Sequence, residues 1–500
     1  MFKQHVLAPV LSSIANYSQR NAFCINSEFY TYEQFGERIS AIRSELVRNS
    51  YKNKKVGLVI EDDIDSYAAI FALWLEGACY VPLHPHWPID RCFDIINQVG
   101  IDLIIDPTTS SSRFSDTGFK NIILTKKQSF SGLYLEPISG VSDRETAYII
   151  FTSGSTGKPK GVPIMRLNVG TFISSLFKFV TNVTCEDRCL QCFDLSFDNS
   201  VLAYLVPLTK GACMYTVPHN VVKYTYIALL LEEEELTFSY MVPSTISLMK
   251  PFFGELQLPK LKYSLFAGEA LYADVTKLWY ECIPNAELYC CYGPTETTVI
   301  MSYHRCYPHI LNKSYNGVIS MGKCMEGTDV LILDDENNIK LVGEVGEICI
   351  SGNQVFDGYW NNEELNKKVF VEIDGKRYYR SGDLGYIDEE GELMSAGRKD
   401  FQVKIQGFRI ELGEIEHHAR EFMGGCNTAC ITTGEDQSHI ELVLFLECDN
   451  VDNNKLTAYL HSKMPPYMVP GKIECRPHFP FNSNGKVDKK QIKIDYLNND

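Results

Sequence analysis

Near its N-terminal end the chain alternates strand-length apolar runs with helix-length segments, and this alternation restricts the possible folds more than any other feature. Strands are predicted at 56–60, 79–81 and 102–105, and helices at 67–75 and 91–99. Strands joined by helices run parallel, because each crossover helix returns the chain to the same edge of the sheet. The pattern therefore predicts an α/β fold in which helices cover the sheets.

The pattern changes twice further along the chain. From about residue 317 short strands and turn glycines replace the α/β rhythm, which indicates a β-rich subdomain over about 317–399. We expect a large N-terminal part, 1–399, followed by a small α+β C-terminal domain, 400–500. In that domain we predict helices at 411–422 and 454–463 and strands at 430–433, 440–446 and 472–476.

Charge and composition argue against two classes of protein. The formal net charge is −16 and no basic block interrupts it, so the chain is not expected to bind nucleic acid. No stretch approaches the roughly 20 apolar residues that a membrane helix needs, so no membrane association is expected. The 17 cysteines are scattered rather than spaced as a disulfide framework, which favours free thiols and a cytoplasmic protein.

A glycine-rich loop follows the apolar run at 148–151. The sequence over 152–161 is Thr-Ser-Gly-Ser-Thr-Gly-Lys-Pro-Lys-Gly. Glycines let backbone N–H groups approach a ligand, hydroxyls add donors and lysines add positive charge, so the loop suits a phosphate. Its spacing does not match a Walker A loop. A different kind of phosphate-binding loop is therefore indicated.

Four more stretches combine glycine with carboxylate, hydroxyl or basic residues. They lie at 292–298, 379–385, 397–411 and 484–490. Each of them alone is an ordinary turn signal. The order of all five stretches along one chain is what supports a functional prediction.

With these five motifs the sequence resembles the adenylate-forming superfamily, and within it the amino-acid adenylation domains of nonribosomal peptide synthesis and the D-alanine–carrier protein ligases. The resemblance extends from about Tyr30 to Lys490. It implies an enzyme that joins a carboxylate to AMP from ATP, releases pyrophosphate and transfers the acyl group to a thiol. When a carboxylate attacks the α-phosphate of ATP, two anions must be aligned and their charge neutralised. The cations and hydrogen-bond donors of the five motifs suit this task.

The resemblance also assigns residues to ATP and Mg²⁺. Glu296 is expected to bind Mg²⁺, Thr295 to contact the α-phosphate, and Lys486 to bridge that phosphate and the substrate carboxylate. Tyr292 offers a ring for the adenine, and Asp383 is expected to accept hydrogen bonds from the ribose. The full ATP-binding set that the resemblance implies is Thr152, Ser153, Gly154, Ser155, Thr156, Gly157, Lys160, Gly268, Tyr292, Asp383 and Arg398.

Two positions near the start of the C-terminal domain are implied to serve the second half-reaction. Asp400 matches the hinge about which a mobile C-terminal domain moves between adenylating and thioester-forming poses. Gly407 lies on the loop expected to approach the pantetheine of the acceptor. Gln406 stands where the family commonly has an arginine, which removes a positive charge from that loop.

Asp198 aligns with the aspartate that pairs with the α-ammonium group of amino-acid substrates. A lone carboxylate in an apolar pocket is costly unless a cation meets it, which favours an amino acid over a fatty or aryl acid. If Asp198 only caps a helix, the sequence no longer favours amino acids over fatty or aryl acids as substrates. The other pocket walls that the resemblance implies are Asn199, Leu202, Tyr240, Leu265, Ala267, Cys291, Val299 and Ile300.

These walls are mostly apolar and carry no second formal charge, so the predicted substrate is a small or medium uncharged amino acid. The predicted acceptor is the phosphopantetheine of a separate carrier protein, supplied in trans, because no carrier domain is visible. Ala267 replaces the cysteine typical of D-alanine ligases, and Cys290 replaces the asparagine common near the adenine amine. A D-alanine–carrier protein ligase, an acyl-CoA synthetase and a non-catalytic nucleotide-binding scaffold are the alternatives.

Overall fold

The computed structural model describes residues 1–49, 54–107, 111–128, 132–154, 158–218, 220–307, 313–399, 402–434, 440–481 and 487–498. The chain divides into two compact units. The first comprises Met1–Pro85, Val99–Ile150 and Gly161–Lys399, and the second comprises His86–Gln98, Phe151–Lys160 and Asp400–Asp500. The domain and subdomain boundaries expected from the sequence stay predictions.

The segment in which strands and helices were expected to alternate contributes its strands to a six-stranded sheet. Its strands are β3 (Lys55–Val59), β4 (Cys79–Leu83), β5 (Ile104–Asp106), β6 (Ile122–Leu124), β7 (Thr146–Thr152) and β8 (Lys160–Met165), with helices α3 (Ile64–Leu75) and α4 (Ile89–Val99) between them in sequence. The strand order is β6-β5-β3-β4-β7-β8, and β3 pairs parallel with β4 and β5. Every residue of β4 is buried, as expected for a parallel strand covered on both faces.

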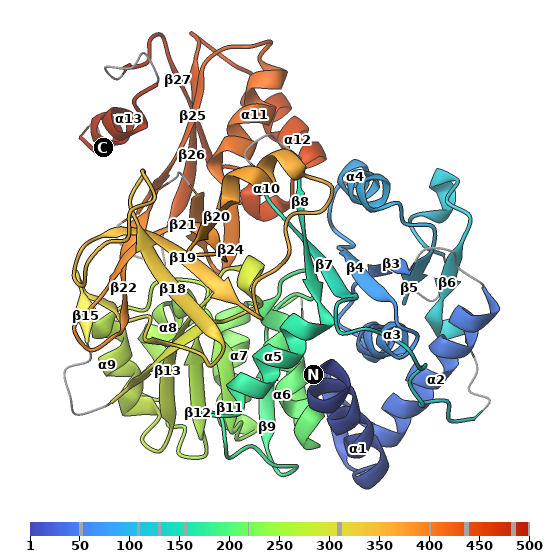
Figure 1. Ribbon diagram of the computed structural model, residues 1–500. Coiled ribbons are helices and arrows are strands. Elements are labelled where there is room, and N and C mark those ends of the chain that lie inside the picture. Colours follow the sequence, from blue (N-terminus) through green and yellow to red (C-terminus); the bar gives the residue numbers. More distant parts are fainter. Residues whose placement is uncertain are drawn as a thin grey trace. The chain divides into compact units, whose positions relative to one another are not determined.

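A nine-stranded sheet lies in the first unit. Its strands are β1 (Asn21–Ile25), β2 (Glu28–Thr31), β9 (Arg188–Gln191), β10 (Cys213–Thr216), β11 (Phe238–Met241), β12 (Tyr263–Phe266), β13 (Glu287–Tyr292), β14 (Ser302–Cys306) and β17 (Lys323–Cys324). The order is β17-β14-β13-β12-β11-β9-β10-β1-β2, and the strands from β13 to β1 run parallel. Figure 1 shows β9, β11, β12 and β13 side by side in green. Their carboxyl ends share one edge, which is where ligands bind in such sheets.

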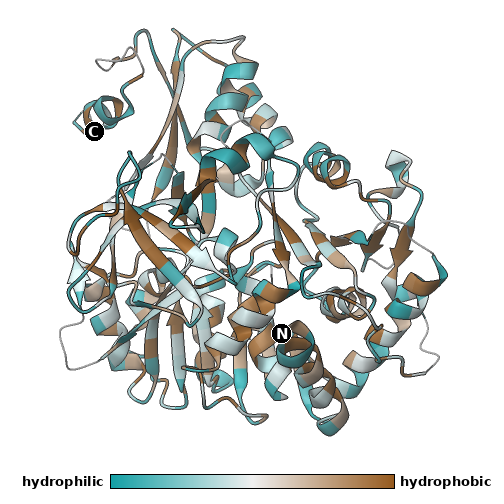
Figure 2. Ribbon diagram, in the orientation of Figure 1, coloured by the Kyte–Doolittle hydropathy of each residue, from teal (hydrophilic) through white to brown (hydrophobic). Residues whose placement is uncertain are grey.

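Helices alternate with the strands of this sheet. They are α1 (Ala8–Asn16), α2 (Tyr32–Arg48), α5 (Arg166–Leu176), α6 (Asn199–Lys210), α7 (Lys223–Glu233), α8 (Pro243–Met249) and α9 (Ala273–Cys282). Helix α2 begins at Tyr32 because Thr31 and Gln34 form a reciprocal capping box. Figure 2 shows brown, white and teal segments along the strands of this sheet and mixed brown and teal on the helices, as expected of amphipathic helices.

Short antiparallel strands follow where the β-rich subdomain was expected. They are β15 (Ser314–Tyr315), β16 (Val318–Ile319), β18 (Thr328–Leu333), β19 (Gly346–Gly352), β20 (Phe370–Ile373), β21 (Lys376–Ile387) and β22 (Leu393–Arg398), with helix α10 (Glu363–Val369) among them. The order β18-β19-β21-β20, with β22 paired to β21, forms one sheet. The β21–β22 register places Asp383 directly opposite Arg398.

The last hundred residues hold a small sheet with helices. The elements are β23 (Gln402–Ile405), β24 (Phe408–Glu411), α11 (Leu412–Phe422), β25 (Thr428–Thr433), β26 (Glu441–Glu447), α12 (Asn453–Lys463), β27 (Lys472–Arg476) and α13 (Lys489–Leu497). Strand β26 pairs antiparallel with β25 and parallel with β27. The five elements predicted here are confirmed, and so is the predicted α/β fold class. No helix in the described ranges is both long and apolar enough to cross a bilayer.

Candidate active site

The glycine-rich loop begins at the carboxyl end of β7 and lies in the second unit. Ser155, Thr156 and Gly157, three of its expected phosphate ligands, are outside the described residues. Thr152 ends β7, and its Oγ1 is buried without a hydrogen-bond partner among the described residues. A buried hydroxyl of this kind is a donor that a ligand can satisfy.

Backbone and side-chain donors of the loop contact strand β24 and the first turn of helix α11. The Ser153 hydroxyl donates to the carbonyl of Arg409 at 3.0 Å and accepts from the backbone N–H of Glu411 at 3.2 Å. The Gly154 N–H donates to a carboxylate oxygen of Glu414 at 3.0 Å, and Lys160 forms an ion pair with Glu411 at 3.4 Å. Donors that hold carboxylates also suit phosphate oxygens, so the loop fits the anion-binding role expected of it.

Glycine is required at position 154. A Cβ atom built at this position would lie 2.2 Å from the carbonyl oxygen of Lys158. This oxygen belongs to the backbone and cannot move aside as a flexible side chain could. Position 154 therefore admits no side chain, because the backbone of Lys158 lies so close to it.

Glu296 occupies a one-turn helix, Thr295–Thr297, that follows the carboxyl end of β13. Its side chain is completely buried, and the Tyr359 hydroxyl donates to it at 2.6 Å. The Tyr379 hydroxyl lies 3.3 Å from that of Tyr359 and extends the network. A buried carboxylate held by an oriented hydroxyl has the donor chemistry of a hard-cation ligand, so Glu296 fits a magnesium ion.

The segment after Glu296 is strained. Thr298 and Val299 have φ of 61° and 70°, a left-handed conformation that is unfavourable for β-branched residues. Gln354 holds the segment in place, because its side-chain N–H₂ donates to the carbonyl of Ile300 at 2.8 Å. A Cβ atom at Gly293 would lie 2.6 Å from the Cα of Ile300. Glycine at this position therefore lets the backbone at 293 lie close to the backbone at 300.

Asp383 and Arg398 form a pair across β21 and β22. An Nη1–H of Arg398 donates to one carboxylate oxygen at 2.5 Å, and the Tyr292 hydroxyl donates to the other at 2.6 Å. Burial and the adjacent Asp383 carboxylate raise the pKa of Tyr292 well above its usual value, so the phenol stays protonated as the donor. Each carboxylate oxygen retains a further lone pair, which suits a ribose hydroxyl.

Asp198 immediately precedes α6 and is only 7% exposed. Its side chain makes no capping hydrogen bond to the first turn of that helix, which argues against the helix-cap alternative. The pKa values of Tyr80, Tyr148 and Tyr240 are raised by burial first, and the charge of Asp198 adds to each. The carboxylate therefore stands close to three buried phenols.

Most of the residues expected to form the pocket walls are buried. The Tyr240 hydroxyl donates to the side-chain oxygen of Asn199 at 2.6 Å. Gly268 has a φ of 91° and lies beside the Asn199 side chain. A Cβ atom built on this glycine would be 3.5 Å from the Nδ2 atom of Asn199. The apolar walls belong to one buried hydrophobic cluster: Leu202, Tyr240, Leu265, Ala267, Cys291, Val299 and Ile300.

Strand alternation explains which cysteine faces the pocket. Cys290 and Cys291 are neighbours on β13, and successive side chains of a strand point to opposite faces. Cys291 belongs to the cluster of pocket walls, whereas Cys290 belongs to the separate cluster on the other side. Cys291 as a pocket wall stays a prediction.

Asp400, the expected hinge, and Lys486, the lysine expected to act in adenylation, both lie outside the described residues. Gln406 and Gly407 form the two-residue turn between β23 and β24, and both have positive φ, of 50° and 81°. Such a hairpin turn strongly prefers glycine, asparagine or aspartate. Gly407 therefore has a conformational role in addition to the open space expected of it.

Residues outside the motifs complete the site. Tyr359 and Gln354 lie in the β-rich part and reach the segment that carries Glu296 and Val299. Glu414 contacts the glycine-rich loop from α11. Sequence reasoning missed them because tyrosine, glutamine and helical glutamate are common, and no local pattern distinguishes these three from others of their type.

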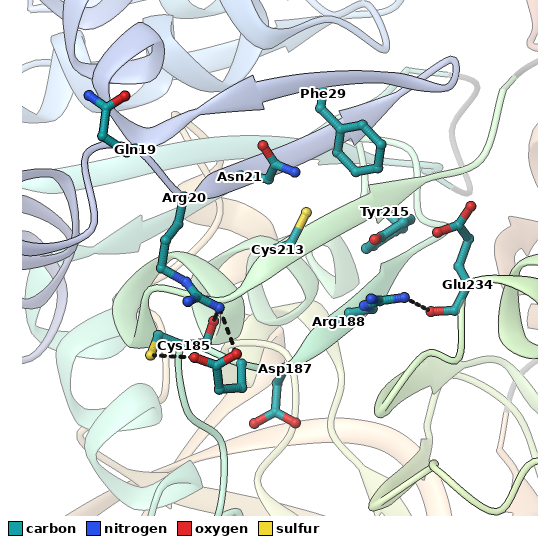
Figure 3. Close-up of a pocket in the computed structure, with 11 residues that line it drawn as sticks. Gln19, Arg20, Asn21, Phe29, Cys185, Asp187, Arg188, Cys213, Tyr215 and Glu234 are labelled. Carbon is teal, nitrogen blue, oxygen red and sulfur yellow. Dashed lines mark hydrogen bonds and ion pairs between the residues drawn. The ribbon is translucent and has the colours of Figure 1, made fainter.

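A polar pocket of about 390 Å³ lies elsewhere in the first unit (Figure 3). Arg20 and Asn21 line it from the start of β1, and Arg188 lines it from the start of β9. These are the amino ends of the parallel strands, opposite to the edge where Asp198 and Tyr292 follow β9 and β13. Arg20 is held in an ion pair with Glu186 at 2.9 Å. The pocket is therefore not part of the candidate active site.

Comparison with known proteins agrees with this geometry. A family model described as AMP-binding enzyme matches residues 11–360. The D-alanine–D-alanyl carrier protein ligases of Bacillus cereus (strain AH187) and Bacillus mycoides (strain KBAB4) are each 31% identical to the chain over 498 residues, which covers 95% of this chain and 96% of theirs.

Solved structures share the fold. An adenylation domain of Vibrio cholerae, AlmE, in complex with glycyl-adenosine-5'-phosphate, superposes with a TM-score of 0.86 at 24% identity, covering 98% of this chain and 97% of that one. A four-domain nonribosomal peptide synthetase bound to AMP and glycine gives a TM-score of 0.69 at 28% identity, covering 98% of this chain and 36% of that one.

Proposed function

The chain belongs to the AMP-binding enzyme family and is an adenylate-forming ligase, and from that premise we propose that it activates a small or medium uncharged amino acid and transfers it to a carrier protein. The single observation that carries the substrate class is the burial of Asp198 among apolar walls. A buried carboxylate favours a cation beside it, and the α-ammonium group of an amino acid is one.

In the first half-reaction a carboxylate oxygen of the amino acid attacks the α-phosphorus of ATP, and the bond to pyrophosphate breaks. Asp198 holds the ammonium group, and Asp383 with Arg398 holds the ribose. The glycine-rich loop, through Ser153 and Gly154, holds the phosphates that leave. These residues act by alignment and by neutralising charge, which is what reaction between two anions requires.

Glu296 and Lys486 complete the assignment. Glu296 would hold Mg²⁺, which supplies positive charge to the phosphates, with Tyr359 orienting its carboxylate. Lys486 is assigned to the oxygen atoms that gain charge between the substrate carboxylate and the α-phosphate. Thr295 is assigned as a hydroxyl donor to that phosphate.

In the second half-reaction the thiol of a phosphopantetheine attacks the acyl carbon and AMP leaves. We assign residues 1–399 to an adenylation core, with a β-rich subdomain over about 317–399, and residues 400–500 to a domain that moves about a hinge at Asp400. Gly407 is assigned to the loop beside the pantetheine. The thiol would belong to a carrier protein acting in trans, consistent with relatives named for a carrier.

D-alanine is the more specific candidate substrate. It is favoured by relatives that are 31% identical over 95% of the chain and are named D-alanine–D-alanyl carrier protein ligases. Alanine is also small and uncharged, as the pocket walls require. Ala267 replaces the cysteine typical of those ligases, so the stereochemistry is left to the experiment.

ATP–pyrophosphate exchange over a panel of L- and D-amino acids tests the proposal. We expect exchange with small uncharged amino acids, and D-alanine ahead of L-alanine if D-alanine is the substrate. Equal exchange with lysine or glutamate would contradict the assigned pocket, and exchange only with simple carboxylic acids would indicate an acyl-CoA synthetase. Loading of a purified holo-carrier protein, compared with coenzyme A, tests the acceptor.

A further inference from the structure

A pair of thiols lies in the second unit, outside all the residues assigned above. Cys448 directly follows β26, and Cys475 lies on β27, the parallel neighbour of that strand. Their Sγ atoms are 3.3 Å apart. Both side chains are half-buried, so a small molecule in solvent can reach them.

The pairing of the two strands produces this contact. The backbone N–H of Cys448 donates to the carbonyl of Leu446 at 3.1 Å, a tight turn that bends the chain at the end of β26. Leu446 is the register partner of Cys475. The bend therefore keeps the Cys448 side chain beside the neighbouring strand, and the two thiols meet through backbone geometry.

The spacing is suitable for a covalent bond. Disulfide sulfurs stand about 2.03–2.05 Å apart, so the two sulfurs need to approach by about 1.3 Å in total. Rotation about χ1 moves a Sγ atom by distances of this order.

We propose that Cys448 and Cys475 form a reversible disulfide, which makes this end of the β26–β27 pair a redox-sensitive modification site. The oxidant class is a hydroperoxide. One thiolate attacks a peroxide oxygen and becomes a sulfenic acid, with release of water, and the second thiol then displaces hydroxide from that sulfur. In sum, two thiols and one hydrogen peroxide give one disulfide and two water molecules.

The bond would constrain the C-terminal part of the chain. It closes a loop that contains α12 (Asn453–Lys463) and fixes the end of β27, eleven residues before Lys486 in the sequence. Cross-linking restricts the unfolded chain, so the oxidised protein should melt at a higher temperature than the reduced protein. Reduction should reverse the shift.

Peptide mapping of the full-length protein tests the site. The reduced protein is treated with hydrogen peroxide, denatured, alkylated and digested. We expect two of the 17 thiols to escape alkylation and one peptide pair, Cys448 linked to Cys475, that dithiothreitol separates. Cys448→Ser and Cys475→Ser should each abolish the link. Cys426→Ser is the matched control, since Cys426 is near enough for Cys448 to affect its pKa, and the link should persist.

Several results would overturn the proposal. They are a link between Cys426 and Cys448, a sulfinic acid at either cysteine with no link, or 17 alkylated thiols under conditions that oxidise glutathione. Mapping of the wild-type chain requires no substitution, so a serine variant that fails to fold leaves the test intact. The readout is also independent of pyrophosphate exchange, so failure of the proposed function would not affect it.

Discussion

The carboxylate of Glu414 accepts a hydrogen bond of 3.0 Å from the backbone N–H of Gly154 in the glycine-rich loop. Glu414 is completely buried, and its other oxygen accepts from Arg91 at 2.6 Å. A carboxylate and a nucleotide phosphate compete for the same N–H donor. The Glu414 contact and phosphate binding at Gly154 therefore exclude each other.

Glu414→Gln should lower the KM for ATP. The amide keeps an oxygen that accepts from Gly154 but loses the charge, and hydrogen bonds to charged groups exceed neutral ones by about 1 kcal/mol, so we expect KM to fall about fivefold. Pyrophosphate exchange at varied ATP concentrations measures this. Glu416→Gln is the matched control, because Glu416 contacts Cys430 and Lys489 instead. An unchanged KM in Glu414→Gln would show that the carboxylate does not compete with ATP.

Asp198→Asn should abolish activation of amino acids while ATP still binds. The substitution conserves size but leaves the substrate ammonium group without its counter-charge in a buried site, which costs about 2–5 kcal/mol. We expect kcat/KM for the amino acid to fall at least about thirtyfold. Equilibrium binding of ATP, measured by calorimetry, should not change. Wild-type exchange rates in the variant would remove Asp198 from the substrate site.

Much of the fold could be predicted because local signals agree with the tertiary structure. Strand β27 has the bounds predicted for it, 472–476, since Gly471 and Pro477 delimit a segment in which charged residues alternate with Ile473 and Cys475. Strand β8 was not predicted, because Pro163 interrupts it. The structure accommodates this proline because β8 is the edge strand of its sheet and needs fewer N–H donors.

The residues of the candidate site also fall into those that the sequence could predict and those that it could not. Asp383 and Arg398 could be named in advance because each lies in a motif with a characteristic order of residues. Tyr359 could not, because its contact with Glu296 depends on how β-rich chain folds back over a segment far away in sequence. The left-handed conformation of Val299 could not be predicted from the sequence either, since valine normally avoids that conformation.

Tyr359→Phe should raise the magnesium concentration that the enzyme needs. The hydroxyl orients the carboxylate of Glu296, and loss of such an outer partner typically costs about 10–100-fold in metal affinity. We expect the magnesium concentration that gives half-maximal exchange to rise about tenfold. Tyr378→Phe is the control, because the Tyr378 hydroxyl donates to Asp329 instead. Equal magnesium dependence in both variants would argue against Glu296 as the ligand.

The stability of the protein should fall as pH rises toward neutrality, because of Asp62. Burial raises the pKa of Asp62 to about 7, and the charges of Asp63 and Asp194 add to the effect. The unfolded carboxyl has a pKa of about 3.9, so between these values the native state binds more protons and stability decreases with pH. The destabilisation is present in full above pH values of about 7.

Asp62→Asn should remove this slope. The amide oxygen can still accept from the Thr216 hydroxyl, which lies 3.0 Å from the carboxylate. We expect the variant to have a higher free energy of unfolding than the wild type at about pH 8 and a smaller change between about pH 5 and pH 8. Urea unfolding at the two pH values measures both. Asp274→Asn, at an exposed carboxylate, should keep the wild-type slope; identical slopes in all three proteins would contradict the prediction.

Val299→Gly should alter substrate choice with little effect on stability. Loss of the buried side chain costs about 1.5–3 kcal/mol, but glycine also relieves backbone strain on the order of 1–3 kcal/mol, so the free energy of unfolding should change by less than about 2 kcal/mol. Ile300→Ala has no such compensation and should cost about 2–5 kcal/mol. Denaturant unfolding distinguishes the two variants.

The same substitution enlarges the proposed pocket at one wall. A missing methylene contact in an apolar pocket changes discrimination by about 1–3 kcal/mol, so we expect the ratio of kcat/KM for leucine over alanine to rise about tenfold or more in Val299→Gly. Exchange with both amino acids, in the wild type and the variant, gives this ratio directly. A parallel loss of activity toward both would mean that Val299 supports the segment after Glu296 without contacting the substrate side chain.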